Sequence, residues 1–346
     1  MNRDVVYALL AALLFGASTP FAKLLLGDVE PVMLAGLLYL GSGVGLTLIR
    51  LIRDRGLNFP QLAITEWTWL FGVILFGGVL GPVTLLFGLS KTTGATASLL
   101  LNLEAVLTAV IAWTVFRESA DKRIVLGMAA IVLGGIALSW QANVDNSLNW
   151  PGPVLISIAC LCWAVDNNLT RMVSASDALF IAGVKGLIAG TVNCALSLVL
   201  GLSLPTGLVV FSTMTLGLIG YGMSLVLFVL ALRGLGTART GAYFSTAPFI
   251  GAAISVVLIG EATGWLFWLS AFLMAVGVWL HLTEHHEHEH HHESLEHEHG
   301  HIHDLHHQHI HDFEWDGQEP HDHKHMHIEV KHKHPHYPDI HHRHTH

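Results

Sequence analysis

Glu104 is the residue whose type and position most suggest chemistry. It lies near the middle of residues 93–119, an apolar segment long enough to cross a bilayer, and Asn102 precedes it by two positions. A carboxylate at the centre of a membrane helix costs about 2.5–3.5 kcal/mol on insertion scales, so such a group usually faces a cavity or a partner. Either Glu104 binds a cation or a proton there, or it is a neutral or paired group that matters only for packing.

A second polar group lies in the following apolar segments. Asp166, Asn167 and Asn168 share one segment, and Lys185 and Asn193 share the next. At the helical rise, Asp166 and Lys185 lie roughly 12 and 15 Å from the turn that joins the two segments, so their side chains can meet. They form either a structural ion pair or a site in which Lys185 attracts a carboxylate and Asp166 an ammonium group. A zwitterionic amino acid suits the second interpretation.

Ten apolar segments position these residues. The chain has 346 residues, of which 52% are hydrophobic and 12% charged, and its mean hydropathy is +0.53, all of which is typical of a membrane protein. Each segment is long enough to span about 30 Å of hydrocarbon. The sequence therefore predicts an all-α membrane protein with ten transmembrane helices. The segments lie near residues 5–26, 31–52, 67–89, 94–116, 124–140, 153–173, 178–200, 208–232, 240–259 and 265–282.

The distribution of basic residues predicts the orientation of these helices. With the N-terminus in the cytoplasm, the cytoplasmic ends collect ten Lys or Arg residues, whereas the opposite ends collect only Lys23 and Lys91. Basic residues favour the cytoplasmic side of short loops. We therefore expect a multi-pass protein of the cytoplasmic (inner) membrane with both termini in the cytoplasm. The ten are Arg3, Arg50, Arg53, Arg55, Arg117, Lys122, Arg123, Arg171, Arg233 and Arg239.

The apolar part contains a weak internal repeat. An offset of 143 residues places Glu118 on Glu261 and Gly134 on Gly277, with further identities over three helices. Residues 1–140 and 141–283 then form two halves of five spans each. An odd number of spans inserts the second half in the opposite sense, so the sequence predicts an inverted repeat with a site between the halves.

The repeated residues carry a resemblance to a known family. Each half ends in a Glu that a Gly follows about sixteen positions later, and the second half has Pro248 before an apolar run that ends in Gly260-Glu261. The first half departs from this pattern at Ala105 and Arg117. The pattern resembles the drug/metabolite transporter superfamily, in particular EamA-type permeases. The resemblance implies ten helices, no ATP hydrolysis, and movement of small organic molecules such as amino acids across the bilayer.

These observations predict a secondary transporter for a small organic metabolite, with Glu104 as the residue that couples transport to protons. A low dielectric favours the neutral form of a carboxyl group, which supports that role. The sequence shows no arrangement of nucleophile, base and cofactor loop, so we do not expect an enzyme. It shows no basic stripe, so we do not expect nucleic-acid binding. Glu118 and Glu261, at the membrane edges, are expected to cap helices or to lie at the interface. The expected substrate-binding residues are Asn102, Glu104, Asp166, Asn167, Asn168, Lys185 and Asn193.

Residues 284–346 form a different region. All 26 histidines lie at or after position 281, and residues 284–346 have a net charge of −10 against +1 for residues 1–283. Low apolar content predicts a disordered cytoplasmic tail, and alternating His-X-His predicts several labile sites for Zn, Ni or Co. The expected metal ligands are His285, His286, His288, His290, His291, His292, His297, His299, His301, His303, His321, His323, His325 and His327.

Three roles for this tail stay open from the sequence. It buffers or senses divalent metal ions, it delivers them to a metal-transporting bundle, or it responds to pH because imidazoles titrate near pH 6.5. The second role makes the protein a divalent metal ion transporter. No histidine precedes His281, which favours an organic substrate over a metal ion.

Overall fold

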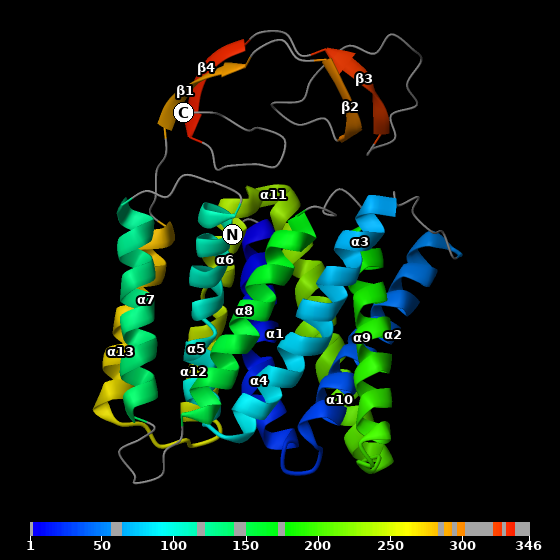
Figure 1. The fold of residues 1–346 in the computed structure, drawn as a ribbon, viewed down its shortest axis with the longest axis vertical. Coiled ribbons are helices and arrows are strands. Elements are labelled where there is room, and N and C mark those ends of the chain that lie inside the picture. The colour runs from blue at the N-terminus through cyan, green and yellow to red at the C-terminus, as the bar shows by residue number, and fades with distance from the viewer. Residues whose placement is uncertain are drawn as a thin grey trace. The chain divides into compact units, whose positions relative to one another are not determined.

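The computed structural model describes residues 3–56, 64–115, 122–141, 150–171, 177–282, 287–292, 296–301, 321–326 and 330–335. The chain divides into two compact units, Met1–Glu284 and His285–His346. In the described part of the first unit, helices joined by turns and short connections form one bundle (Figure 1). Strands are described only in the second unit.

The first half of the bundle contains seven α-helices and one π-helical segment. The π-helical segment η1 connects α3 and α4 without a break, so these three elements cross the bundle as one unit. The elements are α1 (Arg3–Leu25), α2 (Pro31–Asp54), α3 (Ile64–Gly72), η1 (Val73–Leu80), α4 (Gly81–Ser90), α5 (Gly94–Leu100), α6 (Leu103–Thr114) and α7 (Lys122–Gln141).

The second half has the same order of elements, except that the single helix α11 stands where the first half has α4 and α5. A π-helical segment, η2, again connects two α-helices, and it corresponds to η1 under the 143-residue offset. The elements are α8 (Pro151–Arg171), α9 (Ala178–Val199), α10 (Gly207–Leu216), η2 (Gly217–Met223), α11 (Ser224–Phe244), α12 (Ala247–Val257) and α13 (Trp265–Leu282).

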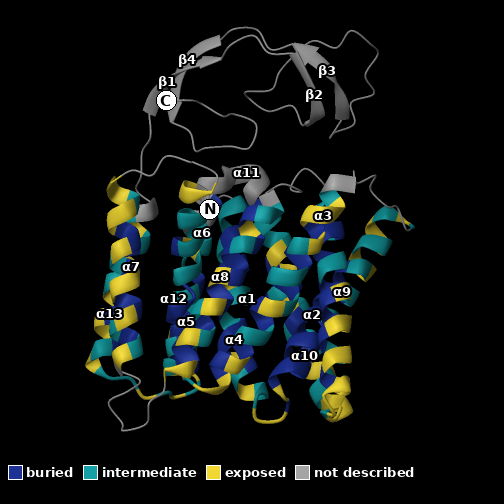
Figure 2. Ribbon diagram, viewed as in Figure 1, coloured by how far each residue is buried: buried dark blue, intermediate teal, exposed yellow. Residues whose placement is uncertain are grey.

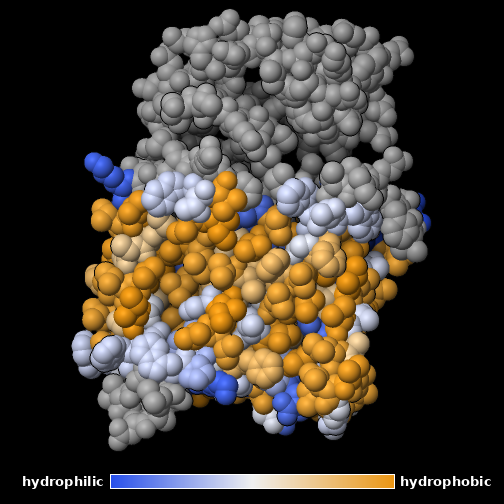
Figure 3. All heavy atoms as spheres, in the orientation of Figure 1, coloured by the Kyte–Doolittle hydropathy of each residue, from blue (hydrophilic) through white to orange (hydrophobic). Residues whose placement is uncertain are grey.

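Eight helices or continuous helical runs in the described residues are long and apolar enough to cross a membrane. They correspond to the first eight predicted spans, and those spans are confirmed to that extent. The two remaining spans correspond to shorter apolar helices, Ala247–Val257 and Trp265–Leu280. Apolar side chains cover the middle of the bundle, and hydrophilic residues gather toward its two ends, as a bilayer requires (Figure 3).

The structure moves one predicted boundary. The sequence predicts a loop at residues 233–239, but α11 continues to Phe244 and the helix is interrupted at Ser245 and Thr246. Pro248 explains the new position, because proline has no N–H to donate to the preceding turn and is tolerated in the first turn of a helix, here α12. The Thr246 hydroxyl donates to the Tyr243 carbonyl at 2.6 Å and stabilises the turn.

The predicted span at residues 94–116 is also interrupted. Helix α5 ends at Leu100, and α6 begins at Leu103. The Asn102 amide donates to the Leu99 carbonyl at 2.9 Å, a local side-chain bond of the kind that competes with helical backbone bonds. Both halves thus have an interrupted helix at related positions.

Helix packing links the two halves throughout the bundle. Helix α2 packs on α9, and α7 packs on α13. Helix α1 of the first half contacts α11 and α12, while the corresponding α8 of the second half contacts α4 and α6. The buried residues lie along these contacts and the exposed ones lie on the outer faces (Figure 2). Each half therefore completes its core with helices of the other half.

The second unit contains four short strands where the sequence predicts a disordered tail. They are β1 (Glu287–His292), β2 (Glu296–His301), β3 (His321–Met326) and β4 (Val330–Pro335). Strand β1 pairs with β4 and β2 pairs with β3, both antiparallel. The difference has a simple origin, since His-X-His alternation has the period of two residues that a strand requires.

Candidate substrate site

Asp166 and Lys185 meet in the middle of the bundle. Lys185 Nζ lies 2.5 Å from Asp166 Oδ2, and the side chains are 18% and 8% exposed. The second carboxylate oxygen, Oδ1, accepts a hydrogen bond from the Thr170 hydroxyl at 3.2 Å. The prediction that these two residues meet is confirmed. Both carboxylate oxygens therefore have partners. The ion pair links α8 to α9, and it compensates two charges that would each be costly alone in a membrane.

The π-helical segment η1 lies directly against this ion pair. A Cβ atom on Gly77 would overlap both the Asp166 carboxylate and Lys185 Nζ. Only glycine therefore fits at this point, because any side chain would displace the pair. The sequence gave no sign that Gly77 packs on Asp166.

Two carbonyl groups of η1 accept hydrogen bonds from other helices. The Gly81 N–H donates to the Phe76 carbonyl and Pro82 has no N–H, so the Gly77 carbonyl lacks its usual helical donor. It accepts instead from the Tyr39 hydroxyl at 2.7 Å and from Trp163 Nε1 at 3.1 Å. Side chains of α2 and α8 thereby complete the backbone bonding of η1.

Asn193 takes the same role one residue further along η1. Its Nδ2 donates to the Gly78 carbonyl at 3.2 Å. In an α-helix this carbonyl would accept from residue 82, but Pro82 has no N–H. Asn193 is fully buried in α9. The predicted site residue Asn193 is thus a partner of the helix backbone. The Gly81-Pro82 dipeptide was the sequence signal that could have indicated free carbonyls here.

Glu104 lies on the other side of α8 and faces a different partner. Its Oε1 accepts a hydrogen bond from Asn167 Nδ2 at 2.8 Å, and the same amide lies 3.5 Å from Thr108 Oγ1. Glu104 is partly buried and Asn167 is exposed. Among the described residues, no cationic side chain forms an ion pair with Glu104. The carboxylate is partly accessible, and Lys185, whose charge acts on it, forms its own ion pair with Asp166.

The remaining predicted site residues bond to the backbone. Asn168 Nδ2 donates to the carbonyls of Ala164 at 2.8 Å and Thr108 at 3.3 Å, and Asn102 bonds to Leu99 in the α5–α6 interruption. Asn168 Oδ1 is buried without a hydrogen-bond partner in the described structure. Asn167 and Asn168 together join α8 to α6, the helix that carries Glu104. The structure thus separates the predicted site into an accessible carboxylate and a set of buried bonds between helices.

Glu261 caps a helix of the opposite half. Its carboxylate accepts hydrogen bonds from the Gly94 N–H at 2.8 Å and the Ala95 N–H at 2.7 Å, at the beginning of α5. The capping prediction for Glu261 is confirmed, whereas Glu118 lies outside the described residues. Close by, Lys23 Nζ donates to the Leu89 carbonyl at 2.7 Å, near the end of α4. The Glu261 bonds hold the α12–α13 connection of the second half against the beginning of α5, and the Lys23 bond joins α1 to the end of α4.

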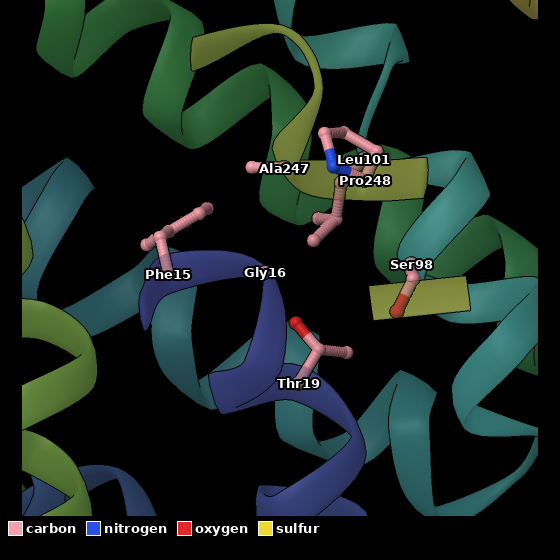
Figure 4. A pocket seen from close by; sticks show the side chains of 7 residues that line it. All are labelled: Phe15, Gly16, Thr19, Ser98, Leu101, Ala247 and Pro248. Atoms are coloured by element: carbon pink, nitrogen blue, oxygen red, sulfur yellow. The ribbon is translucent and has the colours of Figure 1, made fainter. Parts of the chain in front are cut away.

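A small cavity lies between α1, the α5–α6 interruption and the beginning of α12 (Figure 4). Its volume is about 10 Å³, which is room for about one water molecule. Under the 143-residue offset, Ala247 in its wall is the counterpart of Glu104. The cavity is lined by Phe15, Gly16, Thr19, Ser98, Leu101, Ala247 and Pro248. The two halves therefore differ at this position, because the first has a carboxylate bonded to an amide and the second has an alanine that borders a small cavity between the halves.

A bundle of helices long and apolar enough to cross a bilayer, with polar side chains meeting between them, is the architecture of a multi-pass membrane protein. The chain belongs to the EamA-like transporter family, whose model matches residues 3–140 and 150–283. The resemblance drawn from the sequence is confirmed at this level. The family indicates a role in transport, and it implies a lipid bilayer around the bundle and a small molecule as substrate.

Similar proteins agree with this assignment. The chain is 27% identical over 286 residues to an uncharacterized transporter of Methanothermobacter thermautotrophicus, covering 78% of this chain and 83% of that protein. It is 24% identical over 281 residues to the uncharacterized transporter YyaM of Bacillus subtilis, covering 76% and 88%. A crystal structure with 19% identity and a TM-score of 0.61 covers 81% of this chain and 95% of that one, and it supports the fold.

Proposed function

We propose that this protein is a secondary active transporter that moves a small organic metabolite, such as an amino acid, across the cytoplasmic membrane. Glu104 carries the proposal. It is an accessible carboxylate at mid-span whose described partner is the neutral amide of Asn167, whereas Asp166 is compensated by Lys185. A carboxylate in a membrane that has no ion-pair partner of its own favours a ligand that brings positive charge, either a proton or the ammonium group of the substrate.

The repeat supports the transport cycle that we propose. The family model matches each half separately, and the contacts of α1 with α12 correspond to those of α8 with α6. Two such halves inserted in opposite senses form an inverted repeat. Rocking of one half against the other exposes the site between them first to one side of the membrane and then to the other. Glu104 belongs to one half only, since Ala247 is its counterpart. Its carboxylate is therefore an addition to the shared scaffold, as a residue that determines substrate or coupling would be.

Asp166 and Lys185 then have a positioning role. Their ion pair holds α8 between α9 and η1, and α8 presents Asn167 to Glu104. This arrangement is less suited to the alternative, transport of a divalent metal ion. Such an ion needs several ligands, and the Asp166 carboxylate already has partners on both oxygens.

Proteoliposomes test the proposal directly. We would reconstitute the purified protein with a pH-sensitive dye inside, add amino acids one at a time, and record the proton flux that accompanies uptake. Glu104→Gln should abolish the proton flux while exchange of labelled for unlabelled substrate persists. Glu30→Gln, which removes an exposed carboxylate at the beginning of α2, is the control and should behave as the wild type. Proton-driven accumulation that survives Glu104→Gln would refute the coupling role.

A further inference from the structure

The repeat relates the surroundings of Glu104 to the cavity at the beginning of α12. Glu104 of α6 accepts a hydrogen bond from Asn167 of α8, and the offset of 143 residues places Glu104 on Ala247 of α12. An offset of 148 residues, which places aromatic and basic residues of α1 on those of α8, places Thr19 on Asn167. Ala247 and Thr19 both line the cavity (Figure 4). The first of two related positions thus holds a carboxylate with an amide, and the second holds an alanine with a threonine.

The cavity contains a buried hydroxyl group that has no partner. Ser98 of α5 lines the cavity and is 1% exposed, and its Oγ has no hydrogen-bond partner in the described structure. A serine within a helix can donate to the carbonyl four residues earlier, as Ser139 and Ser157 do at 2.7 and 2.9 Å. Ser98 Oγ faces α12 instead, since a Cβ on Gly251 would lie 2.6 Å from it. A buried hydroxyl of this kind is costly unless a ligand completes its hydrogen bonding.

A second hydroxyl group faces the same cavity. Thr19 of α1 is 3% exposed, and its hydroxyl points toward the space between α1 and α12 (Figure 4). Among the described residues that line the cavity, Ser98 and Thr19 have the only polar side chains, and none is charged. Hydroxyl groups can donate to a carboxylate. The cavity therefore offers two donors and no acidic side chain that would repel an anion.

The beginning of α12 adds a favourable dipole. The N-terminal end of a helix carries partial positive charge and attracts anions. In α12 (Ala247–Val257) the N-cap residue Thr246 forms no capping bond with its side chain, and the first turn contains no acidic residue. The first turn of α6, by contrast, contains Glu104. The positive end of α12 thus lacks the negative group that the related helix supplies itself.

The α5–α6 interruption joins this cavity to Glu104. The Glu104 N–H donates to the Leu101 carbonyl at 3.1 Å, and Leu101 lines the cavity. A group that favours positive charge and a cavity that favours negative charge therefore lie on one short segment. An α-amino acid carries both charges on one carbon atom.

We propose that this cavity is the carboxylate-binding part of the substrate site. The Ser98 and Thr19 hydroxyls donate to the substrate carboxylate at the positive end of α12, and Glu104 binds the ammonium group. The inference rests on the proposed transport of an organic metabolite, and it narrows the substrate to a zwitterionic α-amino acid. The two related positions of the repeat then recognise the two opposite charges of one molecule.

The cavity must widen to admit a carboxylate group. Its volume of about 10 Å³ is room for about one water molecule. Its walls belong to α1 and α5 of the first half and α12 of the second, and a Cβ on Gly16 of α1 would overlap the Ala247 carbonyl of α12. Movement of one half against the other therefore changes the size of the cavity directly. The movement that exposes the site to one side of the membrane thereby also admits the carboxylate.

Thermal stabilisation of the full-length protein in detergent tests this subsite. The probes are an equimolar mixture of the twenty common L-amino acids and the same mixture of their α-carboxamides. At pH 6.5 both mixtures carry ammonium groups, but only the first carries α-carboxylates. The wild type should need at least about tenfold more of the carboxamides for the same rise in melting temperature, because they lose hydrogen bonds to a charged group.

Substitutions separate the two ends of the substrate. Ser98→Ala and Thr19→Val should each lower the affinity for the amino acids about tenfold and leave the affinity for the carboxamides unchanged. Glu104→Gln should lower the affinity for both mixtures, because both bring an ammonium group. Ser197→Ala is the matched control, since Ser197 is fully buried in α9 and also has no described partner but does not line the cavity. It should bind both mixtures as the wild type does.

Two results would overturn the subsite alone. One is equal stabilisation by amino acids and carboxamides, because the carboxylate then contributes nothing to binding. The other is affinity for the amino acids at the wild-type level in both Ser98→Ala and Thr19→Val, and Thr19→Val, which keeps the shape of the side chain, provides this test if Ser98→Ala does not fold. A wild type that neither mixture stabilises would overturn the subsite together with the amino-acid substrate. The proton flux through Glu104 in proteoliposomes decides the coupling role separately.

Discussion

Lys185 Nζ of α9 lies 2.5 Å from Asp166 Oδ2 of α8, and this ion pair rests on a glycine of the π-helical segment η1. Helices α8 and α9 of the second half are thereby joined next to η1 of the first half. The ion pair is a point at which the two halves depend on one another.

Removing one charge of this pair should be costly. Asp166→Leu leaves Lys185 buried without its partner, so we expect about 3–5 kcal/mol less stability toward unfolding. The double variant Asp166→Leu/Lys185→Met replaces both charges with apolar groups of similar size and should recover most of the loss. Unfolding of the purified protein in detergent measures both effects. A double variant as unstable as Asp166→Leu would show that the charges do not act as a pair.

Gly77 should tolerate no side chain. In Gly77→Ala the added Cβ overlaps the Asp166 carboxylate and Lys185 Nζ, and overpacking of this kind costs about 1–3 kcal/mol. Gly207→Ala is the matched control, because a Cβ at the beginning of α10 meets no atom within 4 Å. The melting temperature should fall for Gly77→Ala and stay within a degree or two for Gly207→Ala, to judge by the small effects of ordinary surface changes. Equal melting temperatures would contradict the close contact between η1 and the ion pair.

Loss of the Glu261 cap should destabilise the α4–α5 connection. Glu261→Ala leaves the Gly94 and Ala95 N–H groups without their acceptor, and the loss of a helix cap costs about 0.5–2 kcal/mol. Glu30→Ala serves as control, since the Glu30 side chain forms no capping bond. Amide hydrogen exchange measured by mass spectrometry should become faster in peptides that contain residues 94 and 95. Unchanged exchange there would mean that the carboxylate is dispensable as a cap.

Zinc binding by the tail should weaken steeply in acid. Imidazole binds metal in its neutral form and its ordinary pKa is about 6.5, so lowering the pH from 7.5 to 5.5 reduces the neutral fraction roughly tenfold per ligand. A site that depends on two such ligands should lose roughly 100-fold in affinity, and one with four should lose more. Competition with a colorimetric zinc chelator across this pH range measures the loss. A pH-independent affinity would exclude imidazole ligands.

Much of the fold follows from local patterns in the sequence. The length of each apolar segment identifies the spans, and the distribution of Lys and Arg predicts their orientation. Both signals are local, because each depends only on one segment and its ends. The 143-residue repeat and the Gly260-Glu261 ending were sufficient to indicate the family. The carboxylate Glu104 also stood out without a structure, since charge at mid-span is expensive wherever the helix packs.

The tertiary structure decided what each polar residue does. Asp166 and Asn167 are neighbours in sequence, yet one pairs with Lys185 of α9 and the other with Glu104 of α6, because successive helical residues face different neighbours. Asn193 bonds to the Gly78 carbonyl, 115 residues away. Sequence alone thus determined which segments enter the membrane and which residues are costly there, while contacts between distant segments determined their partners.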